Sequence, residues 1–102
     1  MSFYIEIVSK LRQKIRITKR HWDHIVSKHE SIIGLEEIVK ETLKNPTYVR
    51  ISKEDRNVYL YYKPYRKYFL CVVCRHFNGD GFIITAYLTD DIKKGETVYE
   101  TH

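Results

Sequence analysis

Three of the five histidines of this chain, His21, His24 and His29, fall within nine residues of one another in a segment expected to form one short helix. Histidine exchanges protons near neutral pH. Cleavage of RNA without a metal needs a base for the 2′-hydroxyl proton, an acid for the leaving oxygen, and cations that offset the charge on the phosphorane. Histidines with nearby lysines and arginines can supply all three, so this segment is the first candidate for an active site.

Helical geometry divides these histidines between two sides of the helix. His21, His24 and Lys28 share one side because they are three, four and seven positions apart, whereas His29 points about the opposite way with Trp22. We therefore expect His24 and Lys28 to form an exposed pair of acid/base and phosphate-binding groups. His29, near the helix end, either reaches the edge of a sheet as a second acid/base group or is a hydrogen-bonded core residue.

We expect no metal and no cofactor. The spacing of His21 and His24 permits two metal ligands, but Asp23 faces elsewhere and no carboxylate completes the site. Cys71 and Cys74 form a C-x-x-C sequence, yet they lie in an extended apolar run, where residues three apart point to opposite faces of a sheet.

The elements that must position these groups are predicted from hydrophobic periodicity. Helices are expected over residues 18–30, with Thr18 as the cap, and over 35–44, where Asn45-Pro46 ends the second helix. Alternating residues joined by short turns predict an antiparallel meander of four strands, at 48–52, 57–63, 67–75 and 81–88. The predicted fold class is α+β, with two N-terminal helices packed on a four-stranded antiparallel β-sheet in one domain, 1–102. Two further alternating segments are expected to form a short extended N-terminal arm or hairpin, at 3–8 and 14–18.

Pairing across even-length hairpin loops sorts the strand residues between two faces. One face is expected to form the core: Val58, Leu60, Tyr62, Phe69, Cys71, Val73, Phe82, Ile84, Ala86 and Leu88. The other would be a tyrosine-rich platform: Tyr59, Tyr61, Lys63, Tyr68, Thr85 and Tyr87, with Leu70, Val72, Cys74 and Ile83. Such a platform could stack bases and hold phosphates, or it could be covered by the N-terminal arm or a second subunit. A bulge at Asn78-Gly79 would instead swap the faces of the partner strand and bring Arg75 beside Thr85.

Charge points to an anionic partner. The net charge is +5, and residues 44–76 hold eight basic against two acidic groups. Together with nine tyrosines, this composition favours RNA or single-stranded DNA, although a merely soluble basic surface or an acidic protein partner would also account for the charge. Lys63, Arg66 and Lys67 bracket a turn, where they either contact phosphates or form a solvated loop.

The N-terminal sequence has no basic region followed by an apolar run, as a signal peptide would require. No segment has the length and apolar character of a membrane span. We therefore expect a cytoplasmic protein with reduced cysteines and no membrane partner.

Several short motifs occur in an order and spacing that resemble one nuclease family. They are Trp22-Asp23-His24-Ile25, Lys28-His29-Glu30, Glu41-Thr42-Leu43-Lys44-Asn45-Pro46, Leu60-Tyr61-Tyr62-Lys63 and Ile84-Thr85-Ala86-Tyr87. Over about residues 15–99 the chain resembles the phage and mobile-element nuclease-like family grouped with barnase, EndoU, colicin and RelE toxins. The resemblance implies two helices followed by a four-stranded antiparallel sheet, and metal-independent RNase activity in toxin or phage-conflict systems.

Carried over position by position, the resemblance points to His24, His29, Lys63, Thr85 and Tyr87 as site residues. We expect His24 or His29 to act as acid/base, Thr85 and Tyr87 to position the substrate, and Lys63 to bind phosphate together with Arg75. Further contacts to nucleic acid are expected from Lys28, Tyr59, Tyr61, Arg66 and Lys67. The expected substrate is RNA, with tRNA as one candidate, and an antitoxin or immunity protein is a possible partner. The alternative is a non-catalytic RNA- or protein-binding module of the same fold.

Overall fold

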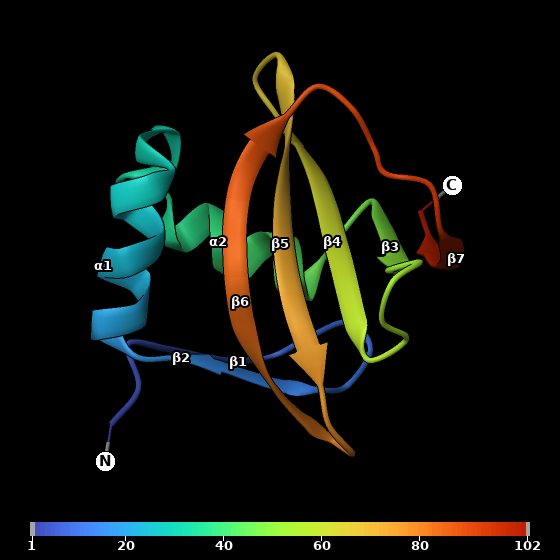
Figure 1. Cartoon of the computed structure of the whole chain (residues 1–102), viewed down its shortest axis with the longest axis horizontal. Coiled ribbons are helices and arrows are strands. Elements are labelled where there is room, and N and C mark those ends of the chain that lie inside the picture. The colour runs from blue at the N-terminus through green and yellow to red at the C-terminus, as the bar shows by residue number, and fades with distance from the viewer. Residues whose placement is uncertain (1, 102) are drawn as a thin grey trace.

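The chain folds around one seven-stranded mixed sheet, seen in a computed structural model that describes residues 2–101 (Figure 1). The strand order is β1-β2-β6-β5-β4-β3-β7. The strands are β1 (Ile5–Val8), β2 (Lys14–Ile17), β3 (Tyr48–Ile51), β4 (Val58–Tyr65), β5 (Tyr68–His76), β6 (Asp80–Thr89) and β7 (Glu96–Glu100). The helices are α1 (Lys19–Lys28), the 3-10 turn η1 (Glu30–Ile32) and α2 (Glu36–Lys44). None of the described helices is long and apolar enough to cross a membrane.

The predicted four-stranded antiparallel sheet is wrong, because three more strands join the meander. The N-terminal segments form the antiparallel hairpin β1–β2, and β2 pairs in parallel with β6 through Lys14–Arg16 and Asp80–Phe82. At the other edge β7 pairs with β3 after a long connection from β6. Both additions join segments far apart in sequence, which local alternation cannot pair.

Two α-helices form close to the predicted positions. The Thr18 side chain caps α1 by accepting a hydrogen bond from the His21 backbone N–H at 3.1 Å. The apolar side of α1 buries Trp22 and Ile25. Helix α2 ends before Pro46 and packs against β1, β4 and β5, behind the sheet in the view of Figure 1.

The β5–β6 pairing contains a bulge that decides which side chains share a face. Val73 pairs with Thr85 while Cys74 pairs with Ile83, so Ile84 is an extra residue in β6. The bulge therefore lies at Ile84, whereas the sequence suggested Asn78-Gly79 as a candidate. Beyond it, Ala86 lies on the face of Val72, and Thr85 and Tyr87 lie on the opposite face.

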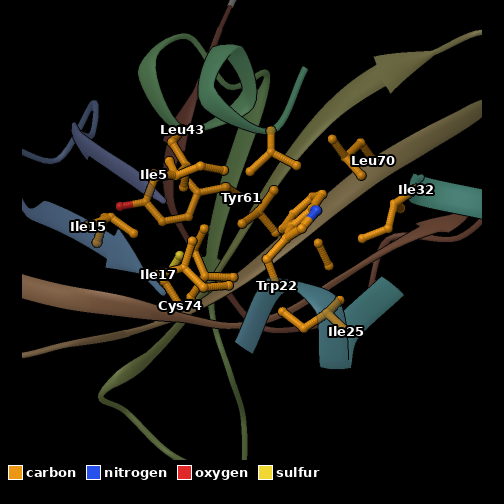
Figure 2. Packing of buried hydrophobic residues seen from close by; sticks show 14 of the residues in the cluster. Ile5, Ile15, Ile17, Trp22, Ile25, Ile32, Leu43, Tyr61, Leu70 and Cys74 are labelled. Carbon is orange, nitrogen blue, oxygen red and sulfur yellow. The ribbon is translucent and has the colours of Figure 1, made fainter. Parts of the chain in front are cut away.

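The helices cover the face that was predicted to be an exposed tyrosine platform. Tyr61 is fully buried in the main core, where it lies between side chains of the β1–β2 hairpin and Trp22 of α1 (Figure 2). Leu70, Val72 and Cys74 are buried on this same face. The predicted assignment of the two faces is thus wrong. The alternative, in which the N-terminal segment covers the face of Tyr61, is the arrangement in the structure.

The opposite face carries a second, smaller apolar cluster. Leu60, Tyr62 and Cys71 are buried there. Ile92, in the connection between β6 and β7, packs on this cluster, and the Lys93 backbone N–H donates to the Tyr62 hydroxyl at 3.1 Å. We call this side of the sheet the loop face, and it is the face on which Thr85 and Tyr87 lie.

Candidate active site

The ring of Tyr87 is contacted by a histidine and a lysine that are far apart in sequence. The centres of the His29 and Tyr87 rings are 5.7 Å apart. The Lys93 ammonium is 6.0 Å from the centre of the same tyrosine ring. An imidazole and an ammonium thus each lie beside one phenol ring of β6, and these groups can accept a proton, stabilise negative charge and donate a hydrogen bond.

Helix α1 brings His29 to this position because it lies along the edge of β6. Pairing between β2 and β6 ends at Phe82, and beyond that point α1 and η1 lie beside β6 (Figure 1). The His21 ring donates from Nε2 to the bulged carbonyl of Ile84 at 2.9 Å. His29 then ends the helix, where its backbone N–H bonds to the Ile25 carbonyl.

A groove of about 570 Å³ runs beside Tyr87 on the loop face. We call it the Tyr87 groove, and its lining includes Leu60, Val73, Thr85, Tyr87, Lys53, Lys93 and Lys94. Its charged lining residues are these three lysines with Glu54 and Asp91, so the rim is net positive. An apolar floor with a cationic rim is suited to an anionic ligand that has flat apolar parts.

Burial keeps the Tyr87 hydroxyl and the neighbouring Cys71 thiol neutral. It raises the pKa of the Tyr87 hydroxyl well above its usual range, and the neighbouring Cys71 adds to the shift. Burial also raises the pKa of the Cys71 thiol to about 11, which the hydroxyls of Tyr87 and Tyr62 partly oppose. Near neutral pH Tyr87 is therefore a phenol that can donate a hydrogen bond, and Cys71 is an unreactive thiol.

The predicted catalytic residues are only partly brought together. Thr85 and Tyr87 line the groove, and His29 contacts the Tyr87 ring from the end of α1. His24 is exposed on α1, with its ring 6.1 Å from that of His21. Lys63 lies on the helix-covered face, where its ammonium donates to the Asn45 carbonyl at the end of α2, at 2.7 Å.

Arg75 lies on the loop face but holds a carboxylate. Its guanidinium donates to Asp55 at 2.7 Å, and its side chain is about one third exposed. The Asn57 backbone N–H and then Arg75 keep the pKa of the Asp55 carboxyl below its usual value. Arg75 is thus on the side of Thr85, as the bulge alternative required, although it pairs with Phe82 and not with Thr85.

The residues predicted to bind nucleic acid are scattered. Tyr61 is buried, so in this structure it has no ring surface to offer a base, and Tyr59 is stacked on His76 with ring centres 3.8 Å apart. Lys28 is exposed on the last turn of α1. Arg66 and Lys67 are exposed at the β4–β5 turn.

The sequence reasoning missed the lysines of the groove. Lys93 and Lys94 follow the last strand of the predicted meander, and Lys53 lies in the β3–β4 connection. The only feature of the sequence that pointed to these lysines was the charged run Asp90-Asp91-Ile92-Lys93-Lys94. This run crosses the sheet because β7, which follows it, pairs with β3, and that pairing was not predicted.

Among residues 2–101, no group of three or more His, Cys, Asp or Glu side chains is placed to hold a metal ion. No family model, curated protein or solved structure matches the chain. Two features of the chain bear on its function: the geometry of the Tyr87 groove and the resemblance in short motifs.

Proposed function

We propose that this chain is a metal-independent endoribonuclease of the toxin or phage-conflict type, with the Tyr87 groove as its active site. The observation that carries the proposal is that His29 and Lys93 both contact the ring of Tyr87. The resemblance in motifs supports it, because His29, Thr85 and Tyr87 are three of the positions that the resemblance selects.

In the proposed reaction His29 takes the proton of the RNA 2′-hydroxyl, whose oxygen attacks the adjacent phosphorus. The bond from phosphorus to the 5′-oxygen breaks, and that oxygen takes a proton from the Lys93 ammonium. Lys93 offsets charge on the phosphorane before it gives up this proton, and the neutral Tyr87 hydroxyl donates a hydrogen bond to a phosphoryl oxygen. Thr85 and the apolar floor hold the substrate. This mechanism uses His29 as the base and assigns no proton transfer to His24 or Lys63.

We place the reaction in the cytoplasm, where RNA is abundant and where the two free cysteines remain reduced. An antitoxin or immunity protein would then be required in the same cell. A pool of tRNA and mixed RNA is the first substrate to test.

The test compares two histidines on one helix. Purified protein is incubated with this RNA pool in EDTA, beside His29→Ala, His24→Ala and Tyr87→Phe. We expect His29→Ala to lower turnover by about 10² or more, the usual scale for loss of a general acid or base. His24→Ala should have a much smaller effect because its ring lies beside His21 and not beside Tyr87.

Equal losses in the two histidine variants would contradict the assignment to the Tyr87 groove. Fragments that persist in His29→Ala would exclude His29 as the base. Wild-type protein that retains RNA on a filter without cutting it would favour the non-catalytic binding module.

A further inference from the structure

A second groove opens where β2 and β6 separate. The pairing of the two strands ends at Arg16 and Phe82, after which the chain leaves β2 and turns into α1. The space between them, about 350 Å³, is walled by Phe3, Phe77, Phe82, Arg16 and His21. We call it the Phe82 groove.

This groove gathers exposed aromatic rings. Phe3, Phe77 and Phe82 are 38%, 54% and 41% exposed, and they are three of the eight large apolar side chains that are exposed among the described residues. The rings of Phe77 and Phe82 are 5.8 Å apart and tilted by 34°. Clustered exposed aromatic surface of this kind marks a binding site more often than scattered exposed residues do.

The groove also presents a cation to a flat ligand. The Arg16 guanidinium lies 5.2 Å from the centre of the Phe3 ring. Its position is fixed by ion pairs with Glu6 at 3.0 Å and Asp80 at 3.3 Å. A stacked guanidinium held in this way is a platform for another planar group.

The Phe82 groove and the proposed active site lie along the same strand. Phe82, Thr85 and Tyr87 all lie on the loop face of β6, and because of the bulge Phe82 and Thr85 pair with residues only two apart on β5, so they are roughly 7 Å apart along the strand. His21 walls the Phe82 groove and bonds to Ile84, the residue before Thr85. A strand of RNA that is cut beside Tyr87 and follows β6 would pass this groove.

From this arrangement we infer that the Phe82 groove binds an unpaired nucleobase of the RNA substrate by stacking it against Phe82 and Phe3. The inference rests on the proposed function for the identity of the ligand, but the binding step does not require cleavage. Stacking on aromatic side chains tolerates any base, so the site would hold the strand without fixing its sequence.

The test measures binding in the absence of chemistry. A fluorescent single-stranded oligonucleotide with 2′-O-methyl groups lacks the attacking hydroxyl, and an abasic strand of equal length keeps the phosphates without the bases. We expect Phe82→Ala to weaken binding of the first by roughly 5- to 150-fold, the range for loss of one base stack, and to leave the abasic strand unaffected. Phe82→Trp should restore binding, and Phe3→Ala should reproduce the loss.

Tyr68→Ala is the matched control. Tyr68 is an aromatic residue that is 48% exposed, and it begins β5, whereas Phe82 pairs with Arg75 near the other end of that strand. Thermal unfolding confirms that each variant is folded. Equal binding by wild type and Phe82→Ala, or equal affinity of wild type for the two strands, would overturn the inference. If cleavage depends on His29 but Phe82→Ala does not change binding, the proposed function holds and the base-binding role of the Phe82 groove is excluded. If Phe82→Ala weakens binding but the wild type cleaves no RNA, the base-binding role holds and the proposed nuclease function is excluded.

Discussion

The buried His76 predicts a loss of stability in mildly acidic solution. His76 ends β5 and is only 9% exposed, with its ring stacked on Tyr59. Its Nε2 lies 2.9 Å from the Tyr61 hydroxyl, which donates to the Ser9 hydroxyl at 2.9 Å. With the Tyr61 proton directed to Ser9, Nε2 is the donor to the Tyr61 oxygen. Burial disfavours the charged ring and lowers the pKa of His76 to about 4.

The sign of the effect follows from where the proton binds first. In the unfolded chain a histidine has a pKa of about 6.5. The unfolded state therefore takes up a proton as the pH falls below 6.5, while folded His76 stays neutral until about pH 4. The stability that neutral, buried His76 contributes is complete at pH 7 and is lost progressively as the pH falls from 6.5 to about 4. From pH 7 to pH 5 the free energy of unfolding should fall by about 2 kcal/mol from this group alone.

Urea unfolding followed by circular dichroism at pH 7, 6 and 5 measures this loss. The window avoids Asp55, because the lowered pKa of its carboxyl confines its contribution to more acidic solution. His76→Gln should be less stable than wild type at pH 7 and should show a much flatter dependence on pH. The pKa itself can be read from the imidazole NMR signals. A His76 signal that titrates near pH 6.5, or the same slope in wild type and His76→Gln, would refute the reasoning.

Two further predictions concern residues that the sequence and the structure assign differently. Tyr61→Phe keeps the buried ring but removes the hydroxyl between Ser9 and His76, so it should lower the free energy of unfolding by about 1–3 kcal/mol in urea and leave RNA binding unchanged. An unchanged free energy of unfolding would contradict the role given to this hydroxyl. Lys93→Gln should weaken RNA binding and reduce by about 1 the slope of the logarithm of affinity against the logarithm of salt concentration. Lys44→Gln, an exposed change at the end of α2, should do neither. A slope in Lys93→Gln equal to that of wild type would show that Lys93 contacts no phosphate.

The helices could be predicted because the forces that define them are local. The cap by Thr18 and the stop before Pro46 each act within one turn of the chain, and both are present in the structure. The apolar spacing of α1 and α2 also gave the sides that they bury. The turn between β4 and β5 is local in the same sense, and the register that pairs Tyr62 with Cys71 follows from it.

The sheet edges could not be predicted because they join distant segments. Parallel pairing of β2 with β6 spans more than sixty residues, and β7 returns to β3 after the β6–β7 connection. The face that the helices cover was equally ambiguous. Both faces of the meander are apolar, with Tyr61 and Val72 on one and Leu60 and Cys71 on the other, so composition alone does not choose between them.

The bulge at Ile84 accounts for the candidate site that the sequence reasoning could not assemble. If Ile84 paired regularly and β6 had no bulge, continued alternation from Ile83 would turn Thr85 and Tyr87 toward the helices and place Ala86 on the loop face. The same residue leaves its carbonyl at the edge of β6, where His21 binds it and fixes α1 beside the strand. Because His29 lies at the end of α1, one insertion in β6 both aims Tyr87 and supplies the anchor that brings His29 to it.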